Sequence, residues 1–414
     1  MITSEIAGVG VLSLAERYGT PLYVYDAGMI ARRIDDLKGF PTIRYAQKAN
    51  SNLTLLSFMR KRGVKVDAVS IGEIHRALKA GYTPKDIVYT ADVFDHPALE
   101  MVAKLRVRVN CGSPDMIAQY GQAVEGGEVT LRINPGFGHG HTQKTNTGGE
   151  QSKHGIWHEE LPAALDIARE HGVTVSGLHM HIGSGTDFDH LAKVCDAMAR
   201  AADLVGDSLR IVSAGGGLPV KYRPEDKSID TAVYVDMWRN AGDVISSRVG
   251  RKLDLEVEPG RYLVAESGTL VTEIRAIKKM GANTFYLVNA GFMTLARAAM
   301  YGAYHPMAIS YAEPERGDDG YRIPVVVGGP LCESGDIFTQ RDGGFVETRS
   351  LPRASVGDFL LIQVAGAYGF TMASNYNSFP FPPEVVIHNG HTYLARERQT
   401  VEDLTRGERV VALG

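Results

Sequence analysis

In the stretch RYAQKAN, residues 44–50, a lysine follows directly after a short apolar segment. Lysines are uncommon at the end of a buried segment. The residues Thr42–Ala46 predict a buried strand, so Lys48 would stand at its carboxyl end. One interpretation is that the side chain only extends along apolar surface to reach solvent. The other is that a partly desolvated amine is held there for covalent chemistry with a carbonyl group.

A run of three glycines, in SAGGGLP, follows another predicted strand. Successive glycines let backbone N–H groups approach an anion closely, so Gly215, Gly216 and Gly217 could cradle a phosphate. No Lys-Ser/Thr pair follows them, which excludes a P-loop. A flexible turn is the alternative interpretation.

Two further predicted strand ends carry ionisable side chains. In GLHMHIGSG, His179 and His181 are two positions apart and would face the same side of a strand. They could be a metal pair or packed core histidines. In VEPGRYLVAESG, Glu258 and Arg261 could form a structural ion pair. Arg261 also argues against a metal site at the histidines, because an arginine beside a divalent cation is electrostatically unfavourable.

Two glycine-rich segments lie later in the chain. Cys332 stands in GGPLCESGD, directly before a carboxylate, and Tyr368 stands between glycines in GAYGFTMASNYN. A free cysteine is usually buried and inert, but a glycine-rich loop is not the expected place for inert packing. Tyr368 could equally be an ordinary exposed tyrosine.

Short apolar runs alternate with helical patterns and would position most of these groups. In IGEIHRALKAGY, for example, Ile71, Ile74 and Leu78 recur at helical spacing and Gly81 marks the end of the helix. Strand–helix alternation predicts parallel strands joined by crossovers, and eight such units predict a closed TIM-like (β/α)8 barrel with functional groups at the carboxyl ends of its strands. The predicted strands are Thr42–Ala46, 64–69, 87–90, 107–110, 129–134, 177–182, 210–214 and 253–258.

The sequence pattern changes near residue 262, after which strand-like runs follow one another with few helices between them. We therefore expect three parts: an N-terminal segment, residues 1–30, that contributes to a β domain; the barrel, residues 31–262; and a mainly β domain, residues 263–414.

Composition narrows the class of protein. The chain has 414 residues and a formal net charge of −4, which argues against a nucleic-acid partner. No run approaches the roughly 18–20 apolar residues of a membrane span. The N-terminus lacks a signal-peptide pattern and the three cysteines form no CxxC motif, so we expect a cytoplasmic protein without a metal site.

A lysine, a phosphate cradle, a histidine and a carboxylate on one barrel rim suggest pyridoxal 5′-phosphate. The chain resembles the bacterial diaminopimelate decarboxylases, members of the fold-type III group that includes ornithine decarboxylases and alanine racemases. The resemblance runs in family order over nearly the whole chain, in the segments YAQKAN, VDAVSIGEI, NPGFGHGHTQKTNTGGEQSKHGI, HMHIGSG, SAGGGLPV, EPGRYLV, GPLCESGDIFTQ, GAYG and SNYNS.

The resemblance implies a role for each candidate residue. Lys48 would be the Schiff-base lysine, His181 would stack on the pyridine ring, and Cys332 would be the acid that a second subunit contributes to shared active sites of a homodimer. The cofactor-binding set would be Lys48, His181, Ser184, Gly217, Glu258, Pro259, Gly260, Arg261 and Tyr368. The substrate-binding set would be Arg261, Arg297, Tyr301, Glu333 and Tyr368.

The implied reaction converts meso-2,6-diaminopimelate to L-lysine and CO₂, the last step of lysine biosynthesis. Glu258 would keep the pyridine nitrogen protonated and so favour decarboxylation over racemisation. At the far end of the substrate, an arginine would bind the second carboxylate and Glu333 the second ammonium group.

Three positions depart from the usual family pattern, namely Met293, Thr294 and Ala298. They leave open a paralogous decarboxylase that acts on a related carboxylated amino acid or conjugate. A non-catalytic pyridoxal phosphate-binding regulator is a remoter alternative, because Lys48 and Cys332 are both present. The polar loop at residues 136–156 could be a mobile lid or simply disordered.

Overall fold

The computed structural model describes residues 1–138, 147–181, 187–313, 315–341 and 343–413. Its contacts divide the chain into two units. One comprises Ala31–Lys221 and Lys227–Leu263, and the other Met1–Ile30, Tyr222–Asp226 and Val264–Gly414. We refer to them as the barrel unit and the β unit.

Eight parallel strands form the barrel unit, which confirms the predicted fold class. Strand β12 pairs with β4, and β10 pairs with both β8 and β11, so the sheet closes on itself. In order around the barrel, the strands are β4 (Thr42–Ala46), β5 (Lys65–Ala68), β6 (Ile87–Ala91), β7 (Arg108–Cys111), β8 (Glu128–Asn134), β10 (Thr174–His179), β11 (Ile211–Ser213) and β12 (Asp254–Val257). A short strand, β9 (Ile156–Trp157), pairs with the end of β8.

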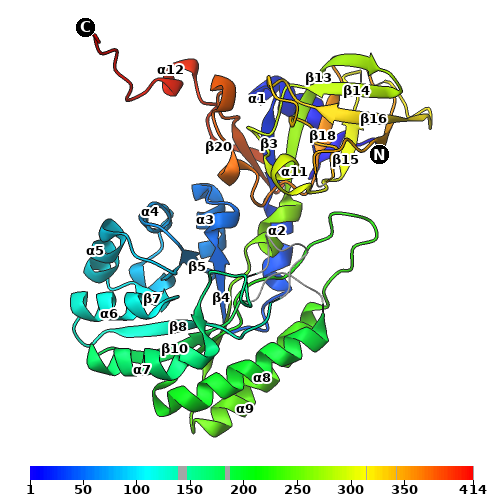
Figure 1. Ribbon diagram of the computed structural model, residues 1–414. Helices are drawn as coiled ribbons and strands as arrows, with labels where there is room; N and C mark the ends of the chain where they lie inside the picture. Colours follow the sequence, from blue (N-terminus) through cyan, green and yellow to red (C-terminus); the bar gives the residue numbers. More distant parts are fainter. Residues whose placement is uncertain (139–146, 182–186, 314, 342, 414) are drawn as a thin grey trace. The chain divides into compact units, whose positions relative to one another are not determined.

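Helices lie outside these strands (Figure 1). Several begin at a side chain that accepts a backbone N–H bond, such as Asn52, Ser70 and Asp95, as expected for helix N-caps. The helices are α2 (Ala27–Asp35), α3 (Leu53–Arg60), α4 (Ile71–Lys79), α5 (His96–Leu105), α6 (Pro114–Ala123), α7 (Leu161–Glu170), α8 (Phe188–Val205), α9 (Thr231–Arg248) and α10 (Arg261–Val264). Within the described residues, no helix is both long and apolar enough to span a membrane.

The β unit is built around a long strand, β13 (Gly268–Met280). It pairs with β3 (Leu22–Asp26), β14 (Asn283–Val288) and β18 (Phe359–Ile362), so the N-terminal segment supplies a strand to this sheet. The other strands are β1 (Glu5–Ile6), β2 (Val9–Gly10), β15 (Met307–Ser310), β16 (Arg322–Gly328), β17 (Arg349–Pro352), β19 (Glu384–His388) and β20 (His391–Arg396). Among the described residues, the helices that lie wholly in this unit are α1 (Val11–Tyr18), α11 (Arg297–Tyr301) and α12 (Val401–Leu404).

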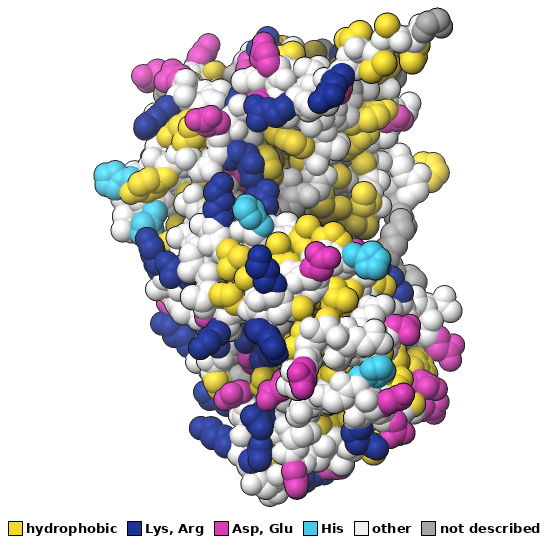
Figure 2. Space-filling model, turned by 90° about the vertical axis from the view of Figure 1, so that its left-hand side faces the viewer, with side chains coloured by type: hydrophobic (Ala, Val, Ile, Leu, Met, Phe, Trp, Pro, Cys, Tyr) yellow, Lys and Arg dark blue, Asp and Glu magenta, His cyan; other side chains and the backbone are white. Residues whose placement is uncertain are grey.

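Apolar side chains from both ends of the chain fill the core of the β unit. Val11 and Leu14 of α1, Leu22 and Val24 of β3, and Val271 of β13 are at most 1% exposed and belong to one cluster. On the face drawn in Figure 2, side chains of both charge signs are spread over the surface, in keeping with the small net charge.

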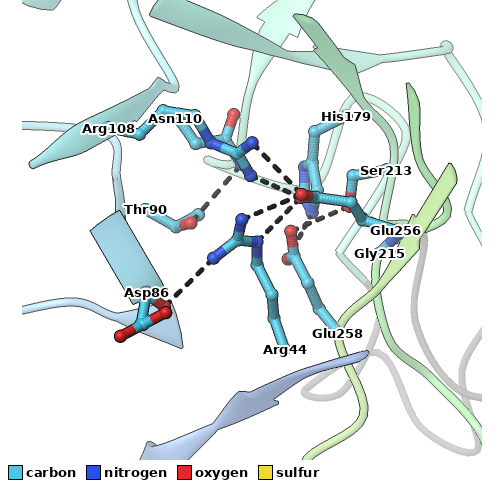
Figure 3. A network of polar contacts seen from close by, with 10 residues as sticks. All are labelled: Arg44, Asp86, Thr90, Arg108, Asn110, His179, Ser213, Gly215, Glu256 and Glu258. Atoms are coloured by element: carbon cyan, nitrogen blue, oxygen red, sulfur yellow. Dashed lines mark hydrogen bonds and ion pairs between the residues drawn. The ribbon is translucent and has the colours of Figure 1, made fainter. Parts of the chain in front are cut away.

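Charged side chains cross the interior of the barrel (Figure 3). The carboxylate of Glu256 accepts two hydrogen bonds of 2.8 Å from the guanidinium of Arg44 and is also paired with Arg108. Burial alone would raise the pKa of Glu256, but the two arginines outweigh it and lower the pKa to about 2. The carboxylate is therefore ionised and compensated inside the barrel.

Replacing Glu256 with Gln should destabilise the barrel by roughly 3–5 kcal/mol, because it leaves Arg44 buried without its counter-ion. Urea and thermal unfolding would measure the loss. The ionised carboxylate stabilises the fold above its ordinary pKa of 4.5, and that contribution is lost as the pH falls toward about 2. The variant should therefore show a flatter acid-stability curve than the wild type.

The matched control is Asp203→Asn. Asp203 pairs with Arg248 at 2.9 Å, but both side chains are 48% exposed, so the substitution should cost no more than about 1 kcal/mol. Equal destabilisation by the two substitutions would contradict a structural role for the barrel ion network.

Candidate active site

Lys48 lies in a single 3-10 turn, Gln47–Ala49, that follows β4 at the mouth of the barrel. The backbone there is fixed, because the N–H of Ala46 donates to the carbonyl of Pro259 at 3.1 Å. The flanking residues Gln47 and Ala49 are fully buried, whereas the side chain of Lys48 is exposed. The turn thus presents an accessible amine on a rigid support.

Two carboxyl groups beside Lys48 have raised pKa values. Burial and the charge of Glu258 raise the pKa of Asp67 to about 6, against the opposing charge of Lys48. Burial raises the pKa of Glu73 to about 7, while the N–H of Val69 donates to its carboxylate at 2.8 Å. Glu73 was not among the predicted site residues. In the sequence, its Ser-x-x-Glu spacing from Ser70 is explained by helix capping alone, so the pattern gives no sign of a second role.

Glu258 is held by two donors at the end of β12 (Figure 3). His179 Nε2 donates to one carboxylate oxygen and Ser213 Oγ to the other, each at 2.8 Å. Burial would raise the pKa of Glu258, but His179, Ser213 and the more distant Arg44 bring it well below its usual range. The barrel mouth therefore holds a buried, oriented carboxylate anion.

His181 lies beyond the strand that carries His179. Strand β10 ends at His179, so the prediction that it continues to residue 182 is wrong. Past that point the chain packs on its neighbours, because the N–H of Gly216 donates to His181 Nδ1 at 3.2 Å and Thr147 Oγ1 donates to the His181 carbonyl at 2.9 Å. Burial and the charges of Arg132 and Lys48 lower the pKa of His181 well below its usual value. His181 is a neutral imidazole that carries its proton on Nε2.

The glycine turn fits closely against its neighbours. A Cβ atom on Gly215 would lie 2.5 Å from the carbonyl of Met180, and one on Gly216 would lie 2.5 Å from the carbonyl of Glu258. Gly217 has a φ of +100°, which side chains rarely allow. Only glycines permit this path. The N–H of Gly215 donates to Ser213 Oγ at 3.2 Å and that of Gly216 to His181 Nδ1, so of the three glycines Gly217 is the one we expect to face an anion.

These features fit pyridoxal phosphate. The barrel mouth combines an exposed amine, a neutral imidazole, a fixed carboxylate and a glycine cradle. Pro259, Gly260 and Arg261 follow Glu258 directly and lead into α10, whereas Ser184 lies outside the described residues. Among the described residues, no group of three or more potential metal-binding side chains occurs, and the two histidines bond to different neighbours.

The β unit carries the remaining predicted residues on three segments. Arg297 and Tyr301 lie in α11, and Arg297 is only 7% exposed. Cys332 and Glu333 are exposed, and the N–H of Cys332 donates to Asn377 Oδ1 at 3.2 Å. Tyr368 has a φ of +56°, a strained conformation for a residue with a side chain.

Asp336 joins two of these segments, and its role was not predicted. Its buried carboxylate accepts the N–H of Phe292 at 2.7 Å and that of Leu331 at 2.9 Å. It thereby shapes the loop that presents Cys332. The only sequence signal was an aspartate among glycines, which also describes an ordinary turn.

The departures from the family pattern fall on buried side chains. Met293, Thr294 and Ala298 are between 2% and 4% exposed. The backbone of this segment makes hydrogen bonds to other parts of the β unit. The Met293 carbonyl accepts the N–H of Ser374 at 2.9 Å, and the Thr294 carbonyl accepts the hydroxyl of Tyr23 at 2.8 Å. These three side chains thus belong to the buried part of the β unit.

Comparison with known proteins agrees with this geometry. The family model for the pyridoxal-binding domain of pyridoxal-dependent decarboxylases matches residues 28–265. The chain is 51% identical to the diaminopimelate decarboxylase of Escherichia coli strain K12, over 97% of this chain and 96% of that protein.

Solved structures are similar over the same length. A diaminopimelate decarboxylase crystal structure superposes with a TM-score of 0.93 at 52% identity, covering 96% of this chain and 95% of that one. A diaminopimelate decarboxylase from M. jannaschii in co-complex with L-lysine has a TM-score of 0.87 at 30% identity, covering 99% of both chains. The chain described here belongs to the diaminopimelate decarboxylase family of pyridoxal-dependent decarboxylases.

Proposed function

We propose that this chain decarboxylates meso-2,6-diaminopimelate to L-lysine and CO₂, the last step of lysine biosynthesis. The observation that carries the proposal is the ionised carboxylate of Glu258, fixed by His179 and Ser213 at the same barrel mouth as Lys48. The close relatives named diaminopimelate decarboxylase support the substrate. Loss of CO₂ leaves an electron pair on carbon, and bound pyridoxal phosphate supplies the electron sink that accepts it.

The barrel residues then have distinct tasks. Lys48 supplies the amine that holds the cofactor covalently. Glu258 keeps a proton on the pyridine nitrogen, because an adjacent anion favours the protonated form. His181, a neutral imidazole, would pack on the ring without adding a competing positive charge. Gly217 and the segment Pro259–Arg261 would also bind the cofactor, as would Ser184, which lies outside the described residues.

Cys332 supplies a proton to the carbon that loses CO₂. We infer that it acts in the site of a second copy, so that the protein works as a homodimer with shared active sites. Its loop suits this role, because Asp336 and Asn377 fix the backbone while the thiol stays exposed. Tyr368 completes the cofactor contacts and, with Tyr301, the substrate contacts.

The far end of the substrate determines specificity. The product is L-lysine, so the retained centre is the L centre and the carboxylate that leaves belongs to the D centre. Arg297, assisted by Arg261, would bind the retained carboxylate, and Glu333 the retained ammonium group. The L-lysine in the M. jannaschii structure carries this same retained end.

We also propose a cytoplasmic location. All three cysteines are free, as expected in a reducing compartment, and Cys332 could not act as an acid if it were oxidised.

The first test measures CO₂ release from meso-diaminopimelate, lysine, ornithine, arginine and glutamate conjugates. We expect release from meso-diaminopimelate alone. Lys48→Ala should abolish both turnover and the fixation of the cofactor by borohydride, because the anchoring amine is gone. Lys38→Ala is the control, since Lys38 is an exposed lysine paired with Asp35 at 2.7 Å. CO₂ release only from another substrate would identify a paralogous activity, and a wild type that binds the cofactor without any release would identify a regulator.

Cys332→Ala should keep the bound cofactor and lose kcat by roughly 10²–10⁴-fold, the usual contribution of a general acid. Cys195→Ala is the matched control, because burial raises the pKa of that thiol to about 12. Mixing inactive Lys48→Ala and Cys332→Ala chains should restore activity if each site draws on two subunits. Normal turnover by Cys332→Ala would show that another group delivers the proton.

Arg297→Ala should raise KM by roughly ten- to a hundredfold with little change in kcat, because the residue binds the end of the substrate that does not react. Steady-state kinetics with meso-diaminopimelate measures both constants. Arg275→Ala serves as the control, since Arg275 is 61% exposed on the β unit. An unchanged KM would refute this assignment of the retained carboxylate.

A further inference from the structure

Arg297 is held by two uncharged groups within the β unit. Its Nη1 lies 3.0 Å from His305 Nε2, and its guanidinium carbon lies 4.8 Å from the centre of the Tyr222 ring. Arg297 and His305 are 7% and 2% exposed.

The hydrogen bonds determine the protonation of His305. Arginine can only donate, so His305 Nε2 must accept. On the other side of the ring, His305 Nδ1 lies 3.0 Å from the carbonyl of Gln363, which can only accept, so Nδ1 must carry the proton. His305 is therefore neutral, in the tautomer that directs a lone pair at Arg297.

Tyr222 supports the same guanidinium from a separate segment. Its ring meets that of His305 edge to face, with centroids 5.5 Å apart. The carboxylate of Asp226 accepts the N–H groups of Tyr222 and Arg223, at 2.9 and 2.8 Å, and so fixes the turn that carries the tyrosine. Arg297 is thus bound at one nitrogen and covered on one face.

We propose that His305, together with Tyr222, is a positioning residue that orients the Arg297 guanidinium toward the carboxylate that the substrate retains. The proposal rests on the proposed function and deepens it by naming what selects a substrate with a second carboxylate.

Two substitutions separate this role from simple packing. His305→Asn places an amide nitrogen near the position of Nδ1, so it keeps the donor to Gln363 and removes the acceptor for Arg297. His305→Gln does the reverse, because the longer side chain places an amide oxygen near the position of Nε2. A positioning role predicts that the Gln variant behaves like the wild type and the Asn variant does not.

The measurement is competitive inhibition of the cofactor-loaded enzyme by two amines. L-Lysine has the retained carboxylate, and 1,5-diaminopentane lacks it. We expect His305→Asn to raise the Ki of L-lysine roughly tenfold or more, the usual effect of losing a hydrogen bond to a charged group. The Ki of 1,5-diaminopentane and kcat should change less than about threefold. His305→Gln should stay within about threefold of the wild type for both inhibitors.

Tyr222→Leu and Tyr304→Leu extend the test. Tyr304 neighbours His305 in sequence, but its ring covers Arg223 and Arg349 instead, at 4.3 and 4.0 Å. Tyr222→Leu should raise the Ki of L-lysine but not that of 1,5-diaminopentane, and Tyr304→Leu should change neither. Circular dichroism and thermal unfolding identify any variant that fails to fold.

Equal loss of affinity for both inhibitors, or a larger loss with Gln than with Asn, would overturn the proposal and leave His305 as a packing residue. This outcome is distinct from failure of the proposed function, in which the wild type would release no CO₂ from meso-diaminopimelate.

Discussion

A single buried carboxylate determines much of the chemistry available at the barrel mouth. Glu258 is ionised because His179 and Ser213 each donate to it, and it lies next to the glycine turn, since its own N–H donates to the carbonyl of Gly215 at 2.7 Å. Together with burial, the anion raises the pKa of Asp67, and it stands at the strand end next to the one that carries Lys48. In the proposed mechanism, this anion is the group that would keep the pyridine nitrogen protonated.

The barrel can hold that anion because charges elsewhere in its interior are compensated. Arg44 and Arg108 share the carboxylate of Glu256 (Figure 3). Removing one member of such a group from water is costly unless its partners remain in place. The polar interior is thus a structural requirement of the site, and it explains why strands buried on both faces still contain arginine, glutamate and asparagine.

In the β unit, polar side chains fix the loops that carry the predicted site residues. The carboxylate of Asp336 accepts backbone N–H groups and shapes the loop of Cys332, and His305 is hydrogen-bonded to Arg297. Asp336 and His305 are both buried, as are Met293 and Thr294, two of the positions that depart from the family pattern.

The sequence alone was sufficient for the fold class, the eight barrel strands and the family. Those properties follow from local periodicity and from motifs a few residues long. The tertiary structure alone decided where the sixth strand ends, that Asp67 and Glu73 border Lys48, and which groups hold Glu258, Cys332 and Arg297. His179 and Glu258 are 79 residues apart and Ser213 and Glu258 are 45 apart. These contacts depend on strand register and on closure of the sheet, and no local sequence pattern encodes either of them. The protonation and orientation of each site residue are set by the side chains that the closed barrel brings into contact with it.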